Sequence, residues 1–192
     1  MALKIRCAWC EKDDLYRNYH DYEWGKPVYD DDKLFEFLIL ETFQAGLSWY
    51  TILSKRENFR KALAGFDCKT IALYNDEKVQ ELMLNAGIIR NLLKIKASIS
   101  NAIAFIKVQE EFGNFSKYIW NFVDEKPILN MPKKHQDIPA TTPLSDAISN
   151  DLKKRGFKFV GSTVIYAYLQ ATGIVNDHVE DCWTKNEFNF PT

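Results

Sequence analysis

The segment from residue 34 to residue 50 constrains the fold of this chain more than any other. Leu34, Phe37, Leu38 and Glu41 recur at the spacing of one helix face, so a carboxylate lies on the stripe that should face the core. Burying an ionised carboxylate costs several kcal/mol unless it is paired, hydrogen-bonded or open to a polar cavity. The segment therefore predicts a buried helix with either a satisfied structural acid or a functional one, and spacing alone favours the structural acid.

A glycine interrupts the helical pattern directly after this stretch. Gly46 allows a sharp turn, Leu47 projects from it, and Ser48 is a good N-cap for a second helix whose first turn carries Trp49. An acid, a prominent leucine and a large aromatic ring should therefore meet at one helix junction. Trp49 is explained equally well as a core residue.

Helical periodicity continues along most of the chain, and no strand pattern of comparable length occurs. The expected helices cover residues 31–44, 49–65, two short stretches within 67–87, 88–112, 115–123, 144–155 and 162–172. The arm before residue 30 is irregular apart from a short helix near 15–20, and the proline-bearing stretch 124–143 should run over the surface. The length of 192 residues suits an all-α fold in a single domain, 1–192.

Charge and hydropathy limit the partners and the compartment. The formal net charge is −1, so bulk charge does not indicate a nucleic-acid partner, although basic residues cluster at 55–56, 60–61, 133–134 and 153–155. Solvated helix faces explain each cluster equally well. No apolar run reaches the roughly 18 residues of a membrane helix, and no signal peptide is evident. We therefore expect a soluble, cytoplasmic protein with reduced cysteines.

Thiol and imidazole side chains near the two ends of the chain fit a metal site. His178 and Cys182 have the spacing of one helical turn, which suits a zinc chelate, and Cys7 and Cys10 form a Cys-x-x-Cys motif with His20 close behind. These are five candidates for four tetrahedral positions. A closed set of four ligands would be structural and would tie the arm to the C-terminal tail. Ordinary buried cysteines are the alternative, and a redox pair lacks the surrounding strand and helix pattern.

The residues between the last two expected helices resemble a helix-hairpin-helix. Gly156 and Gly161 bound a short turn that could approach a phosphate closely, and the free amides at the start of the helix from Ser162 would bind it. Lys158 and the basic residues 153–155 would add counterion release. Any helical hairpin can carry glycine at both ends, so this pattern alone is a modest indication.

Several longer motifs occur together and in order. They are Arg6-Cys7-x-Trp9, Tyr19-His20-Asp21-x-Glu23-Trp24-Gly25, Leu40-Glu41-x-x-Gln44-Ala45-Gly46-Leu47-Ser48-Trp49, Lys55-Arg56-Glu57-Asn58, Ala86-Gly87-Ile88-Ile89-Arg90, the hairpin from Lys153 to Gly161, and Val175-Asn176-Asp177-His178. With these motifs, the chain closely resembles the 3-methyladenine DNA glycosylase I family over about residues 6–182.

This resemblance implies a helix-hairpin-helix glycosylase fold with one structural zinc ion. The family's zinc ligands fall on Cys7, His20, His178 and Cys182. Cys10 is then a spare thiol. Zinc would bring residues 1–30 and 174–192 together around a helical body of residues 31–173.

The resemblance also implies an activity, namely monofunctional removal of N3-methyladenine from alkylated double-stranded DNA by base flipping and hydrolysis. Glu41 would be the catalytic residue, as base acceptor and electrostatic stabiliser. The substrate-binding residues would be Tyr19, Trp49, Trp9 and Trp24. The DNA-binding residues would be Gly46 and Leu47, which would enter the duplex, with Gly156, Lys158, Gly161 and Ser162 of the hairpin.

The chemistry of the lesion fits these roles. N3-methyladenine in DNA is positively charged, so electron-rich rings and a carboxylate attract it, whereas normal adenine lacks that charge. The same charge weakens the bond to the sugar, so little acid assistance is needed. No lysine occurs in the motifs assigned to the pocket, which argues against a Schiff-base lyase step.

Other interpretations stay open at this point. The wider superfamily places a catalytic aspartate after the hairpin, and the nearest residue here is Asp177, which we interpret as a helix cap or a partner of a zinc ligand. The alternative function is a non-catalytic, zinc-stabilised DNA-binding module that senses damage. We expect a monomer that needs no nucleotide cofactor and does not bind membranes.

Overall fold

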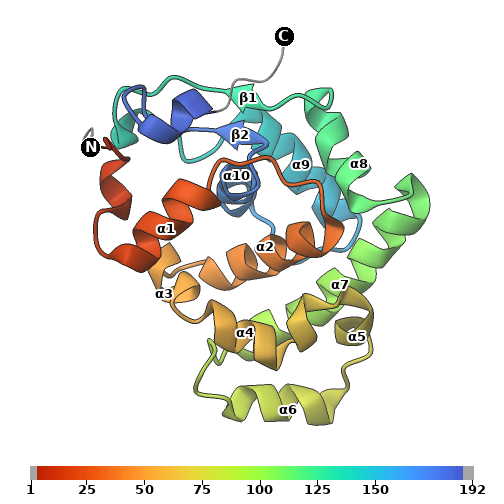
Figure 1. Cartoon of the computed structure of the whole chain (residues 1–192). Helices are drawn as coiled ribbons and strands as arrows, with labels where there is room; N and C mark the ends of the chain where they lie inside the picture. The colour runs from red at the N-terminus through yellow and green to blue at the C-terminus, as the bar shows by residue number, and fades with distance from the viewer. Residues whose placement is uncertain (1–3, 188–192) are drawn as a thin grey trace.

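Helix α2 (Asp31–Gln44) lies at the centre of the molecule, as the computed structural model of residues 4–187 shows (Figure 1). Every residue from Leu34 to Phe43 is buried, so this helix is enclosed on all sides and not along one stripe only. Helices α10 (Ser162–Ala171) and α7 (Leu92–Phe112) pack against it. The largely helical architecture expected from the sequence is confirmed.

The remaining elements surround this centre. They are η1 (Ala8–Cys10), α1 (Asp14–Tyr22), α3 (Trp49–Leu53), α4 (Arg56–Ala62), η2 (Ala64–Phe66), α5 (Cys68–Ala72), α6 (Asp76–Leu84), α8 (Phe115–Trp120), η3 (Asn121–Val123), η4 (His135–Asp137), α9 (Pro143–Lys154) and η5 (Trp183–Glu187). Two short strands, β1 (Ile128–Leu129) and β2 (Val175–Asn176), pair in parallel and join the long connection before α9 to the segment after α10. None of the helices within residues 4–187 is long and apolar enough to cross a membrane.

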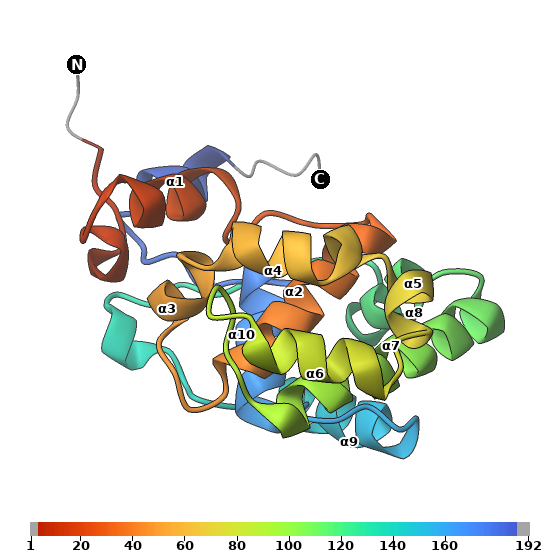
Figure 2. The same ribbon diagram turned by 90° about the horizontal axis from the view of Figure 1, so that it is seen from below.

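The N-terminal arm and the segment around η5 lie side by side in both views (Figures 1 and 2). The backbone amide of Trp183 donates a hydrogen bond of 2.9 Å to the carbonyl of Ile5. On the arm itself, Arg6 donates to both carboxylate oxygens of Asp21 at 2.9 to 3.0 Å. Segments from the two ends of the described chain therefore form one structural unit.

Two helix boundaries differ from those expected. The helix expected over 49–65 is divided into α3, α4 and η2, because the chain turns at Ser54, where Arg56 enters the interior to meet Glu36 at 2.8 Å. The long helix begins at Leu92 and not at residue 88, because the Asn91 side chain caps it by accepting from the amide of Lys94. Local spacing did not reveal either boundary.

Candidate functional site

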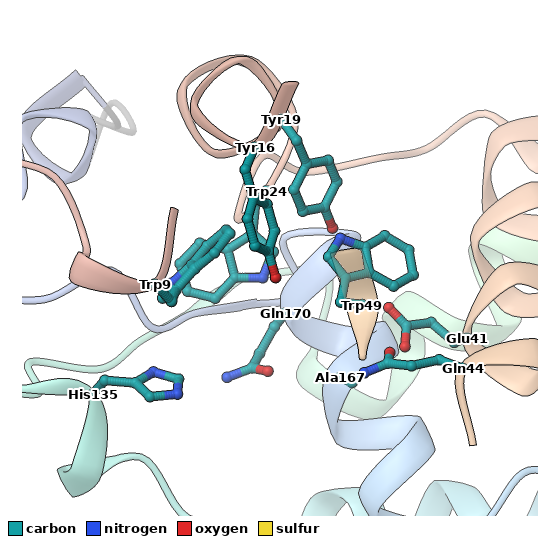
Figure 3. A pocket seen from close by; sticks show the side chains of 10 residues that line it. All are labelled: Trp9, Tyr16, Tyr19, Trp24, Glu41, Gln44, Trp49, His135, Ala167 and Gln170. Carbon is teal, nitrogen blue, oxygen red and sulfur yellow. The ribbon is translucent and has the colours of Figure 1, made fainter. Parts of the chain in front are cut away.

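A cavity of about 290 Å³ opens beside α2, α3 and α10 (Figure 3). Its lining residues are Trp9, Tyr16, Tyr19, Trp24, Glu41, Gln44, Trp49, His135, Ala167 and Gln170. The five residues that the resemblance assigned to the base pocket therefore share one cavity. Their roles in catalysis and binding remain predictions.

Of the lining residues that the structure describes, Glu41 is the only one with a carboxylate, and it is almost completely buried, with 3% of its surface exposed. Among the described residues, its Oε2 atom has no hydrogen-bond partner. Burial raises the pKa of the Glu41 carboxyl well above its usual range, because no nearby charge compensates the loss of water. A structural acid satisfied by a backbone group or an arginine is therefore excluded, and an acid at a polar cavity remains.

Aromatic rings form the walls around this acid. The ring centroids of Tyr19 and Trp49 are 5.3 Å apart, and those of Trp9 and Trp24 are 5.1 Å apart. The Trp49 Nε1 atom is buried and has no partner among the described residues. The cavity thus offers π faces, one unpaired donor and one unpaired acceptor, which suits a flat, electron-poor heterocycle.

The turn after α2 places a leucine at the surface. Gly46 has a φ of +81°, a conformation that favours glycine, and Leu47 is 40% exposed. The buried Lys94 of α7 holds this turn, because its Nζ atom donates to the carbonyl oxygens of Phe43 at 2.8 Å and Ala45 at 2.5 Å. Sequence reasoning missed Lys94, since a lysine within a helical pattern normally indicates a solvated face.

The turn between α9 and α10 is bounded by Gly156 and Gly161. Gly156 has a φ of +97°, whereas Gly161 has an ordinary backbone conformation and leaves open space around its Cα atom. The Lys158 amide donates to the Asn101 side chain at 2.7 Å and is therefore not available to a ligand. Arg155 is held by Glu111 at 2.7 Å, so it does not add a free positive charge. Ser162 is the first residue of α10, as expected.

Four of the five thiol and imidazole candidates come together in the interior. The ligand atoms of Cys7, His20, His178 and Cys182 all lie within 4.8 Å of one another, and all four residues are buried. The Sγ atom of Cys182 is 3.4 Å from the ring nitrogens Nε2 of His20 and Nδ1 of His178, and Cys7 Sγ is 3.6 Å from the latter. This group could hold a metal ion.

Both imidazole rings are oriented by partners on their other nitrogen. The Nδ1 atom of His20 lies 2.8 Å from Asp21, and the Nε2 atom of His178 lies 3.0 Å from the carbonyl oxygen of Trp24. A carboxylate and a backbone carbonyl are the usual partners of metal-binding histidines. Cys10 does not belong to this group; its thiol lies 3.1 Å from the carbonyl oxygen of Cys7.

Two expectations near the metal group are wrong. His178 directly precedes a turn that ends at Cys182, in which the Cys182 amide donates to the Val179 carbonyl at 2.9 Å, so the two residues are not one helical turn apart on a helix. Asp177 is therefore not a helix cap, and its carboxylate contacts Tyr166, Gln170 and Asn130. A turn places two ligands of this spacing together as well as a helix does.

Sequence reasoning missed half of the cavity lining, namely Tyr16, Gln44, His135, Ala167 and Gln170. Tyr16 and Tyr19 lie three positions apart on α1, so helical spacing could have indicated their shared face. His135 comes from the long connection before α9, and no local signal places that connection at the cavity.

A helical fold with an aromatic cavity around an unpaired acid defines a class of proteins whose site suits a flat ring that carries positive charge. The chain belongs to the methyladenine glycosylase family, whose model matches residues 9–185. It is 48% identical over 177 residues to DNA-3-methyladenine glycosylase 1 of Escherichia coli (strain K12), covering 92% of this chain and 95% of that protein. It is 46% identical over 183 residues to DNA-3-methyladenine glycosylase of Haemophilus influenzae, covering 95% and 99%.

Solved structures show the same fold. A crystal structure of 3-methyladenine DNA glycosylase I matches with a TM-score of 0.90 at 48% identity, covering 93% of this chain and 98% of that chain. A variant of such a glycosylase in complex with 3-methyladenine matches with a TM-score of 0.91 at 35% identity, covering 94% and 97%.

Proposed function

We propose that the chain is a monofunctional DNA glycosylase that extrudes N3-methyladenine from alkylated double-stranded DNA and hydrolyses its bond to deoxyribose, as in base excision repair. The observation that carries this proposal is the Glu41 carboxyl, which is buried, has no hydrogen-bond partner for Oε2 among the described residues, and lines the same cavity as the rings of Tyr19 and Trp49. A protein that only binds DNA has no use for such an acid, which makes a non-catalytic damage sensor the less favoured alternative.

Selection follows from charge. Burial favours the neutral form of Glu41 in the empty cavity, and an incoming cationic base favours the carboxylate by direct attraction. The rings of Tyr19 and Trp49 add a cation–π contribution. An uncharged purine would leave the buried carboxyl without this compensation, so normal adenine is bound less well.

Bond cleavage then needs little proton transfer to the base. The bond between C1′ and N9 breaks with its electron pair going to the purine, whose positive charge is neutralised as it leaves. The remaining sugar cation is stabilised at a distance by the Glu41 carboxylate, which is effective because Glu41 is only 3% exposed and so lies in a low-dielectric environment. Extrusion costs less for a damaged base than for a normal one.

The duplex would be held by the two turns already described. Leu47 on the Gly46 turn would fill the gap that the extruded base leaves. The turn from Gly156 to Gly161, with Lys158 and the amides at Ser162, would bind the backbone phosphates as a helix-hairpin-helix.

The metal group would hold a structural zinc ion. Zinc bound to two thiolates and two imidazoles places sulfur and nitrogen atoms about 3.5 Å apart in a tetrahedron, which matches the 3.4 to 3.6 Å separations here. Because protein ligands fill all four positions, zinc would supply a crosslink between the two ends of the chain and would not activate water. We also propose a cytoplasmic monomer with one domain, 1–192, of which the structure describes residues 4–187.

An excision assay tests the proposed function. Duplex DNA methylated with a simple alkylating agent should release free N3-methyladenine, detected by chromatography, without strand cleavage at neutral pH. Glu41→Ala should lower the release by about 100-fold, the size of effect seen when a transition-state stabiliser is removed. Retention of methylated DNA without release of a base would support the damage-sensing alternative instead.

A further inference from the structure

Gln170 of α10 lines the cavity, and its amide has a fixed orientation. Its Nε2 atom lies 2.7 Å from the Oδ2 atom of Asp177. A carboxylate only accepts hydrogen bonds, so the NH₂ group of Gln170 must face Asp177. The carbonyl oxygen Oε1 is thereby turned away from Asp177 and stays free to accept, since no hydrogen bond to it occurs among the described residues.

Both carboxylate oxygens of Asp177 accept hydrogen bonds from neighbouring side chains. Asp177 is 1% exposed, and its oxygens accept from the Tyr166 hydroxyl at 2.6 Å, from Gln170 and from the Asn130 side chain at 2.7 Å. It does not belong to the cavity lining. Asp177 therefore acts on the site only through Gln170.

The cavity has a closed end and an open end. Glu41 is buried and marks the closed end, whereas Gln170 is half-buried and His135 is exposed. Figure 3 shows Gln170 standing between His135 and the side of the cavity that carries Glu41 and Gln44. A base seated against Glu41 leaves its sugar toward the open end, where water enters.

We propose that Gln170 is a further catalytic residue that holds the attacking water through Oε1, and that Asp177 is the positioning residue that fixes the Gln170 amide. This inference rests on the proposed function and names its nucleophile-binding group. The water oxygen forms a bond to C1′, the C1′–N9 bond breaks with its electrons going to the base, and the water proton passes to solvent. A cationic sugar is a strong electrophile, so the water needs orientation more than a strong base.

Single-turnover kinetics with methylated duplex test the role of Gln170. Gln170→Ala should lower the excision rate by about 30-fold, because a misplaced reactant costs up to 100-fold. The same variant should bind free N3-methyladenine, followed by tryptophan fluorescence, within about threefold of the unmodified chain. Gln80→Ala, on the exposed side of α6, is the matched control and should change neither quantity.

A swapped pair tests the fixed orientation. Asp177→Asn should lower the rate by about tenfold, because an amide at this position can pair with either end of Gln170. The double variant Asp177→Asn with Gln170→Glu reverses the pair: the amide introduced at position 177 donates to one oxygen of the carboxylate introduced at position 170, and the other oxygen accepts in the cavity. This double variant should recover most of the excision rate that Asp177→Asn alone loses. Tyr166→Phe removes another donor to Asp177 and should lower the melting temperature while the rate stays within threefold. Each variant is checked for metal content, because Asp177 precedes His178.

The outcomes separate this inference from the proposed function. If the unmodified chain releases no N3-methyladenine, the proposed function is wrong. If it does, and Gln170→Ala keeps the unmodified rate, or loses rate only in proportion to its loss of base binding, the water-holding role is overturned. If Asp177→Asn does not fold, the Gln170→Ala result still decides.

Discussion

Two buried glutamates on α2 differ in what surrounds them. Glu36 accepts from Arg56 at 2.8 Å and from Lys33 at 3.0 Å, and these charges hold the pKa of its carboxyl below the usual range despite burial. Within residues 4–187 Glu41 has no such partner, and burial raises the pKa of its carboxyl. Glu36 is therefore a structural acid that ties α2 to α4, whereas the ionised form of Glu41 carries an energetic cost that a cationic ligand would relieve.

This cost predicts the pH dependence of stability. The folded-state pKa of Glu41 lies above the unfolded value, so between the two the native state keeps a proton that the unfolded state has lost. Raising the pH through this interval therefore destabilises the fold. Glu41→Gln should raise the melting temperature by about 4 °C at pH 8 and by less at pH 5, measured by thermal unfolding. Glu110→Gln, an exposed acid on α7, is the control; an equal gain at both pH values would contradict this account of Glu41.

At the scale of elements, α7 supports both turns that we assign to DNA. Lys94 binds the carbonyls before Gly46, and seven residues later the Asn101 side chain bonds to the backbone of Lys158 in both directions, at 2.7 and 3.1 Å. Seven residues return to the same helix face after about 10 Å. One rigid helix therefore fixes the spacing between the leucine turn and the hairpin.

Leu47→Ala tests the leucine turn. Because the side chain is 40% exposed, its removal should change the melting temperature by less than about 1 °C. Excision from duplex DNA should fall by about tenfold, whereas binding of the free base should stay unchanged, because only the filling of the vacated gap is lost. Leu84→Ala at the end of α6, where the leucine is 82% exposed, is the matched control. Equal excision by the two variants would remove Leu47 from the extrusion step.

Local patterns predicted the parts of these elements that depend on neighbouring residues. Gly46 takes the positive φ expected of it, and Ser48 caps α3 by accepting from the Thr51 amide. The turn at Ser54 depends instead on an ion pair between Arg56 and Glu36, twenty positions apart. Spacing along the chain carries no information on such a pair, so the break between α3 and α4 could not be predicted.

At the scale of the whole molecule, the cluster of Cys7, His20, His178 and Cys182 joins residues that are up to 175 positions apart. Spacing alone left five candidates, and it took the resemblance to select these four. Spacing alone also placed His178 and Cys182 on a helix, although neither residue is helical. Residue types and the resemblance together predicted which four residues come together, but the backbone that carries them could not be predicted, because the segment after Cys182 pairs with the distant N-terminal arm through Trp183 and Ile5.

Metal removal tests whether this cluster holds the two ends together. The purified chain should contain about one zinc ion, and a strong chelator should lower its melting temperature by more than about 10 °C, because a structural zinc contributes directly to folding. Cys182→Ser should lose the metal, whereas Cys10→Ser should keep it, since the Cys10 thiol lies outside the cluster.

Hydrogen exchange after metal removal should locate the loss of protection in the N-terminal arm and around η5, with α2 and α7 protected as before. A chain that loses zinc with Cys10→Ser, or that unfolds as a whole on chelation, would show that the metal supports the core of the fold and not the junction of its two ends.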